Sequence, residues 1–227
     1  MKKIILFFIA AASIILMQSC SGTDQDLYSC DPAVNEWVSS HLQEIRKMSR
    51  QNWLNTSVEI SGAIFSAFTQ EQKIKFWKEK LETVKRLDWS QKEVEHINKI
   101  EEFIDNNTNL FNSVPLTDEQ EDLLEAFFYK WYNYGIEVLG WKENVGIAIA
   151  GSGYTLLDKE GNLELPSGKE IMVLSSEVES CTCSTGASIF CFVSGEGTCD
   201  DADCTEGNYC GWLLLQRCDG RCSNSII

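Results

Sequence analysis

The cysteines of this chain are concentrated at its C-terminal end. Eight of the ten lie between Cys181 and Cys222, and none lies between Cys30 and Cys181. So short a segment cannot bury an ordinary hydrophobic core, so it needs covalent cross-links to fold. In an oxidising compartment the eight thiols predict four local disulfides, whose pairing stays open because on the order of a hundred connectivities exist. The predicted framework comprises Cys181, Cys183, Cys191, Cys199, Cys204, Cys210, Cys218 and Cys222.

The N-terminus has the pattern of an export signal. Residues 1–19 start with two lysines and continue with an apolar run, Ile4 to Met17, that is too short to span a bilayer. The small residue and cysteine that follow resemble the lipobox of bacterial lipoproteins, which implies cleavage before Cys20 and lipidation of that cysteine. The alternative is a plain secretory signal, and both interpretations deliver the chain to an oxidising compartment.

Residues 20–30 form a polar tether in this interpretation. Its acids, Asp24 and Asp26, resemble the export signal of surface lipoproteins of the Bacteroidetes type. We therefore expect a lipoprotein of the bacterial outer membrane, attached through its N-terminal lipid and exposed at the surface. If Cys20 is lipidated and the last eight cysteines pair, Cys30 is left as a free thiol.

Residues 31–140 have the apolar period of helices. One apolar stripe runs from Val34 to Met48. Three later stripes are each preceded by a Ser or Thr that has a Glu or Gln three residues after it. These three predicted capping boxes are Thr69 with Gln72, Ser90 with Glu93, and Thr117 with Gln120. We expect a bundle of four or five helices, with a loop at residues 106–115 and a helix stop at Gly140.

Residues 141–178 are rich in glycine and lack a helical period. We interpret them as a connector with short strands and turns at residues 159–161 and 166–168. The segment Gly151-Ser152-Gly153 lacks the third glycine and the strand–helix setting of a phosphate loop. The fold class is therefore mainly α: a helical bundle, a glycine-rich β/loop connector, and a disulfide-rich module at residues 179–227.

The sequence lacks the common signatures of catalysis. It has no GxSxG, HExxH or Walker motif. Both histidines, His41 and His96, are expected on helices, and His96 on a helix surface. The aromatic stripe from Phe127 to Tyr134 suggests a cofactor pocket, but core packing is the simpler interpretation. We expect no enzyme activity and no cofactor, and a net charge of −15 disfavours nucleic acid as a partner.

Metal binding is the main alternative to disulfides. Cys181 and Cys183, with Cys218 and Cys222, have a spacing that can ligate zinc, but this leaves four thiols unused and needs a reducing compartment. The acids in residues 200–206 resemble a calcium loop, although the glycine comes one position late and the bidentate glutamate is missing. We expect no metal.

The C-terminal segment resembles the fulvocin C-related bacteriocins. The resemblance covers residues 179–227 and rests on the run from Cys181 to Thr185 (CTCST), the six later cysteines and the pair Gly211-Trp212. It implies four disulfides, a long precursor region upstream, and a role in interbacterial antagonism for a released antimicrobial fragment. Six acids against two bases in residues 181–227 favour an envelope receptor on the target bacterium over membrane disruption. The alternative is a non-enzymatic surface-binding lipoprotein that keeps the module attached for recognition.

Overall fold

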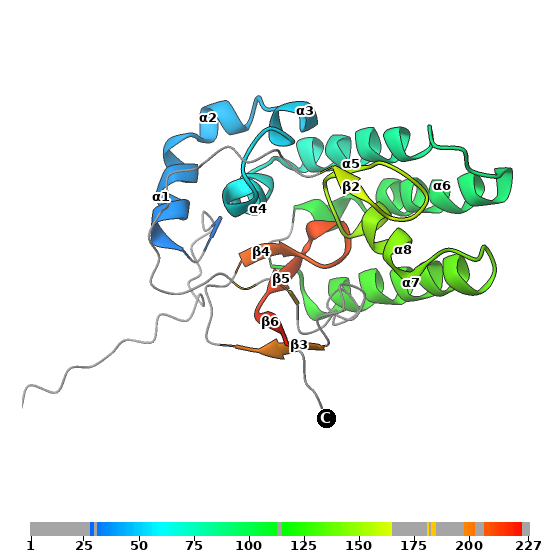
Figure 1. The fold of residues 1–227 in the computed structure, drawn as a ribbon. Coiled ribbons are helices and arrows are strands. Elements are labelled where there is room, and N and C mark those ends of the chain that lie inside the picture. Colours follow the sequence, from blue (N-terminus) through cyan, green and yellow to red (C-terminus); the bar gives the residue numbers. More distant parts are fainter. Residues whose placement is uncertain are drawn as a thin grey trace, which may run out of the picture.

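The computed structural model describes residues 28–29, 31–112, 115–164, 181, 183–184, 198–202 and 207–223, and is mostly helical (Figure 1). The helices are α1 (Pro32–Ser40), α2 (Leu42–Ile45), α3 (Arg50–Trp53), α4 (Val58–Ser66), α5 (Gln70–Val84), α6 (Gln91–Asn106), α7 (Asp118–Glu137) and α8 (Glu143–Ala150), with 3₁₀ turns η1 (Thr108–Phe111) and η3 (Trp212–Leu214). The strands are β1 (Thr155–Leu156), β2 (Leu163–Glu164), β3 (Thr198–Asp201), β4 (Gly207–Cys210), β5 (Gln216–Cys218) and β6 (Gly220–Ser223). The mainly helical class with a disulfide-containing C-terminal part is confirmed.

The three long helices start where the sequence predicts. At each of the three predicted pairs, the hydroxyl of the cap accepts the N–H three residues on, and the Glu or Gln side chain accepts the N–H of the cap. These reciprocal bonds satisfy N–H groups that the first turn of a helix leaves unpaired. The apolar stripes then face a common core, because each stripe recurs at the helical period.

The N-terminal region contains more and shorter helices than predicted. The stripe from Val34 to Met48 is broken at His41, where α1 ends and α2 starts. The carbonyl of Trp37 accepts hydrogen bonds from Ser40 Oγ (2.8 Å) and His41 Nδ1 (2.8 Å), so side chains compete for a carbonyl that a continuous helix would use. Helices α3 and α4 follow, so the prediction of four or five helices was too low.

The connector contains a helix that the sequence analysis missed. Helix α8 is apolar on nearly all sides, and a helix buried all round has no amphipathic period to recognise. The predicted hairpin is confirmed: β1 pairs with β2, and Gly161 has a positive φ of 88° in the turn. The second predicted turn, at residues 166–168, lies outside the described residues.

The cysteine-rich part shares the core of the helices. Trp212, Leu213 and Leu215 are buried in the same cluster as residues of α5 to α8. The Trp212 ring stacks on Phe128 of α7 at 4.8 Å, and Trp77 Nε1 of α5 donates to the carbonyl of Leu213 at 2.9 Å. Figure 1 shows β4 and β5 among the helices rather than apart from them. The helices and residues 212–215 therefore share one core.

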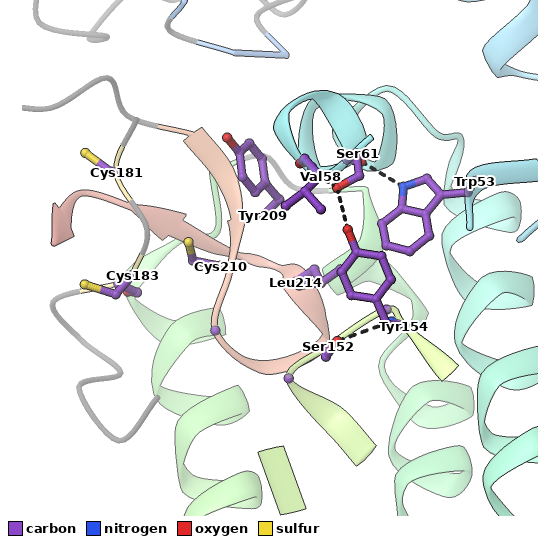
Figure 2. Close-up of a pocket in the computed structure, with 15 residues that line it drawn as sticks. Trp53, Val58, Ser61, Ser152, Tyr154, Cys181, Cys183, Tyr209, Cys210 and Leu214 are labelled. Carbon is purple, nitrogen blue, oxygen red and sulfur yellow. Dashed lines mark hydrogen bonds between the residues drawn. The ribbon is translucent and has the colours of Figure 1, made fainter. Parts of the chain in front are cut away.

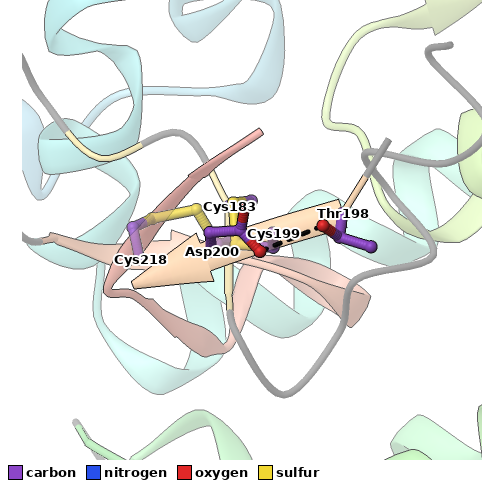
Figure 3. The surroundings of a disulfide bond; sticks show 6 residues. Cys183, Thr198, Cys199, Asp200 and Cys218 are labelled. Carbon is purple, nitrogen blue, oxygen red and sulfur yellow. Dashed lines mark hydrogen bonds between the residues drawn. A yellow bond between two sulfur atoms is a disulfide. The ribbon is translucent and has the colours of Figure 1, made fainter. Parts of the chain in front are cut away.

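Short strand pairs and disulfides hold the C-terminal part together. β3 pairs with β6 and β4 with β5, both antiparallel. Bridges join Cys183 to Cys199, shown in Figure 3, and Cys210 to Cys218. Their Cα–Cα distances of 6.0 and 5.2 Å are ordinary for disulfides.

Candidate functional site

A cavity of about 440 Å³ lies where the cysteine-rich part meets the helices (Figure 2). We call it the junction cavity. Its lining comes from α3 and α4, the segment between α8 and β1, the cysteines, and the segment from β4 to η3. The residues are Trp53, Val58, Ser61, Gly62, Gly151, Ser152, Gly153, Tyr154, Cys181, Cys183, Ser184, Tyr209, Cys210, Gly211 and Leu214. The volume is in the range of small-molecule sites.

Glycines allow the walls of the junction cavity to approach closely. A Cβ on Gly62 of α4 would lie 2.2 Å from the ring of Tyr209 on β4, and one on Gly153 would lie 2.6 Å from the ring of Trp53. No side chain fits at either position without moving an aromatic ring. Gly62 therefore sets the distance between α4 and β4.

The polar groups of the junction cavity are hydroxyls and backbone atoms. Ser61 Oγ donates to the carbonyl of Val58 (2.9 Å) and lies 3.3 Å from the hydroxyl of Tyr154. Burial raises the pKa of Tyr209, so that phenol stays neutral. The described residues that line the junction cavity include no carboxylate, amine, guanidinium or imidazole. Such a surface suits an uncharged, largely apolar ligand with a few hydrogen-bonding groups.

Two buried cations hold the backbone behind this cavity. Lys80 Nζ donates to the carbonyls of Ala148 (2.6 Å) and Ser152, and Arg50 donates to the carbonyl of Gly153 (2.9 Å). Burial lowers the pKa of Lys80 well below its usual value and that of Arg50 to about 10. The segment from residue 151 to 153 follows the C-terminal end of α8, where backbone carbonyls attract cations rather than phosphate.

A second cavity, of about 470 Å³, runs along the outer side of α6 and α7. We call it the aromatic groove. It is lined by His96, Lys99, Phe103, Asn107, Leu123, Ala126, Phe127, Lys130, Trp131 and Tyr134. The aromatic stripe of α7, which we interpreted as core packing, lies only partly in the core: Phe128 and Trp131 are buried, whereas Tyr134 is 40% exposed.

His96 is buried, so the prediction of a surface histidine was wrong. Its ring is parallel to that of Trp131, at 5.1 Å, and lies 4.7 Å from that of Tyr134. Nε2 must donate to the carbonyl of Trp131 (2.8 Å), which leaves Nδ1 as an acceptor with no hydrogen-bond partner in the part of the chain that the structure describes. Burial and the nearby charge of Lys99 lower the pKa of His96, so the ring is neutral at pH 7.

The structure describes six of the eight cysteines predicted to form the framework. Cys181, Cys183, Cys199, Cys210, Cys218 and Cys222 are all in disulfides, which confirms disulfide bonding in this region. Cys191, Cys204, Cys30 and the proposed lipidation site Cys20 lie outside the described residues. Three of these bonded cysteines, Cys181, Cys183 and Cys210, line the junction cavity.

The remaining predicted features lie partly within the described residues. Thr198 Oγ1 donates to Asp200 at 3.0 Å, as Figure 3 shows, while Asp203 and Glu206 of the acidic loop are not described. Within the described ranges, no three His, Cys, Asp or Glu side chains are grouped as metal ligands. No helix in that same part of the chain is long and apolar enough to cross a membrane.

Comparison with known proteins gave no match to a family model, to a curated protein or to a solved structure.

Proposed function

We propose that this chain is a non-enzymatic binding lipoprotein whose cysteine-rich module stays attached to the helices and forms one wall of the binding site. One observation carries the proposal: residues 212–215 are part of the helical core, while the neighbouring residues 209–211 line the junction cavity. Release of the module would pull Trp212 and Leu213 out of that core. Each such side chain contributes about 2–3 kcal/mol through burial, so an attached module is the more stable arrangement.

The chemistry of the junction cavity defines the class of ligand. Its rings, Trp53, Tyr154 and Tyr209, offer flat apolar surfaces, and the hydroxyls of Ser61 and Tyr154 offer hydrogen bonds. A charged ligand would lose its hydration without gaining an ion pair there. We therefore propose a small neutral amphipathic molecule, such as an aromatic alcohol or amide.

A rim variant tests this site. Val58 is 56% exposed at the edge of the junction cavity, and Leu157 is 53% exposed outside its lining. Val58→Trp should block entry of the neutral fluorescent probe N-phenyl-1-naphthylamine and weaken its binding at least about tenfold. Leu157→Trp is the matched control and should leave binding unchanged. Equal binding by both variants would place the probe elsewhere and contradict the proposal.

Membrane attachment through Cys20 is a separate part of the proposal. It is supported by the apolar run and the cysteine that follows it, and it implies an outer-membrane location. Cys20→Ala should release the protein from the membrane fraction of its native host. A variant that stays membrane-bound with an unchanged N-terminus would show that the lipobox interpretation is wrong.

The resemblance to the fulvocin C-related bacteriocins supports a second proposal, interbacterial antagonism. The cysteine pattern from Cys181 to Cys222 favours it, and the packing of residues 212–215 favours action by the whole chain over a released fragment. Its partner would be an envelope receptor on a target bacterium. The oxidised full chain should inhibit some related strain, and reduction should abolish that inhibition. Lack of inhibition across a broad strain panel would contradict the antagonism, and only the proposed binding function would remain.

A further inference from the structure

The charge of the aromatic groove is opposite to that of the chain. Among the described residues, the only charged side chains in its lining are Lys99 and Lys130, although the chain carries a net charge of −15. Neither lysine has an ion-pair partner among the described residues. Two unpaired ammonium groups at one groove are an attractive site for an anion.

Flat rings form most of the apolar surface of the groove. Phe103 and Phe127 stack at 4.1 Å with an angle of 19° between their planes, and Trp131 and His96 stack with an angle of 1°. Lys99 Nζ lies 5.0 Å from the centre of the Tyr134 ring, so its charge is held beside an aromatic face. Offset stacking and edge contacts with such rings favour a planar aromatic ligand over a flexible aliphatic one.

The two helices hold these groups in place. His96, Lys99 and Phe103 of α6 and its C-cap Asn107 recur at steps of three and four, and the lining residues of α7 do so from Leu123 to Tyr134. The groups therefore follow the line along which two antiparallel helices meet. Trp131 Nε1 donates to the carbonyl of His96 at 2.9 Å, and His96 Nε2 donates back to the carbonyl of Trp131, so α6 and α7 are fixed to each other at this end.

We infer that the aromatic groove binds a small planar aromatic anion, with the ring against Phe127 and Tyr134 and the anionic group between Lys99 and Lys130. This site differs from the junction cavity in position and in ligand charge, since no charged side chain is among the described residues that line that cavity. It does not depend on the proposed function. Its volume of about 470 Å³ accommodates one or two fused rings with a carboxylate.

The experiment compares 2-naphthoate with its neutral counterpart, 2-naphthalenemethanol, on the full chain. The readout is the shift of the Trp131 indole N–H signal in ¹⁵N-resolved NMR spectra, assigned with Trp131→Phe. Naphthoate should bind saturably and at least about tenfold more tightly than the alcohol, and the difference should shrink as salt is raised. Similar binding of both compounds would overturn the inference.

Charge-removing variants complete the test. Lys99→Gln and Lys130→Gln should each weaken naphthoate binding about fivefold or more and leave binding of the alcohol unchanged. Lys92→Gln, an exposed lysine on α6 outside the groove, is the matched control and should have no effect. Equal effects of all three variants would show only a general charge effect and contradict the site. Val58→Trp should not alter naphthoate binding, which separates this result from any failure at the junction cavity.

Discussion

Helices α5 to α7 and the cysteine-rich part are stabilised in different ways, yet they depend on one another. Each long helix has its own capping box and an apolar stripe. The strands of the cysteine-rich part have at most four residues, and disulfides join Cys183 to Cys199 of β3 and link β4 to β5 through Cys210 and Cys218. The two parts meet at residues 212–215, where the backbone of Leu213 and Leu214 has positive φ values of 54° and 55°. Such a conformation costs about 1 kcal/mol or more per residue, so it persists where packing fixes it. The contact with the helices thus shapes the module as well as stabilising the core.

The largest expected effect comes from removing Trp212 at that contact. Trp212→Ala should lower the free energy of unfolding by about 3–5 kcal/mol, because a buried ring stacked on Phe128 is lost. Tyr129→Ala on α7, where the side chain is 72% exposed, is the control and should change it by less than about 0.5 kcal/mol. Urea unfolding followed by far-UV circular dichroism measures both. A small effect of Trp212→Ala would mean that the helices do not need the module.

A fragment of residues 31–140 tests whether the helices fold without the cysteine-rich part. The apolar stripes predict that residues 31–140 fold alone and unfold cooperatively, independently of reductant. In the structure this fragment lacks α8 and residues 212–215, which pack in its core. We therefore expect a loss of cooperative thermal unfolding in the isolated fragment. A sharp transition would instead support independent parts.

Replacing either of two buried lysines on α5 by methionine should change the free energy of unfolding, in opposite directions for the two positions. Lys80→Met removes the donor to the carbonyls of Ala148 and Ser152 and should destabilise by about 2–4 kcal/mol. Burial lowers the pKa of Lys73 to about 8, and among the described residues its ammonium makes no hydrogen bond and contacts only the face of the Phe65 ring, at 5.7 Å. Lys73→Met should therefore stabilise by about 1–2 kcal/mol at pH 7.

The pH dependence of Lys73 checks this explanation. A lowered pKa means that the folded state releases the proton more readily than the unfolded state, so wild-type stability gains as pH rises between about 8 and 10.5. The advantage of Lys73→Met should shrink between pH 7 and pH 9.5 in the same urea experiment. A constant advantage would mean that packing, not charge, causes the gain.

Removal of one disulfide should have an intermediate effect. The bridge between Cys210 and Cys218 closes a short loop, with a sequence separation of 8, so the double variant Cys210→Ser with Cys218→Ser should lose about 2–3 kcal/mol. This bridge holds the segment that presents Trp212 to the helices. The loss should therefore appear in helical circular dichroism as well as in the module. Unchanged helical unfolding would argue for independent parts.

The sequence predicts the long helices better than the cysteine-rich part, because the helices have local signals whereas the cysteine-rich part depends on contacts between residues far apart in the chain. The capping boxes at Thr69, Ser90 and Thr117 are local signals, and the helices follow them. Helix α8 was missed because it is apolar all round, and the burial of His96 was missed because it depends on rings of α7 and on Trp141. Cysteine spacing predicted disulfide bonds but could not indicate the contact between Trp212 and Phe128. The junction cavity was missed for the same reason, and a glycine inside the apolar helix α4, Gly62, was its one local signal.

The smallest expected effect is a difference in pH response between the two ends of the α6–α7 pair: His96 of α6 packs against Trp131 and Tyr134 of α7, and Glu121 lies in the first turn of α7. Burial lowers the pKa of His96, so its contribution to stability is complete above its unfolded value near 6.5 and is lost as pH falls below that value. Burial and neighbouring acids raise the pKa of Glu121 near the other end, so the cost of its charge appears as pH rises above about 4.5. Between pH 7 and pH 5.5 wild-type protein should therefore lose stability through His96, and His96→Gln should reduce that loss, while Glu121→Gln should stabilise slightly at pH 7. Urea midpoints at both pH values measure this. An identical pH response of wild-type protein and His96→Gln would mean that the buried imidazole does not titrate in this range.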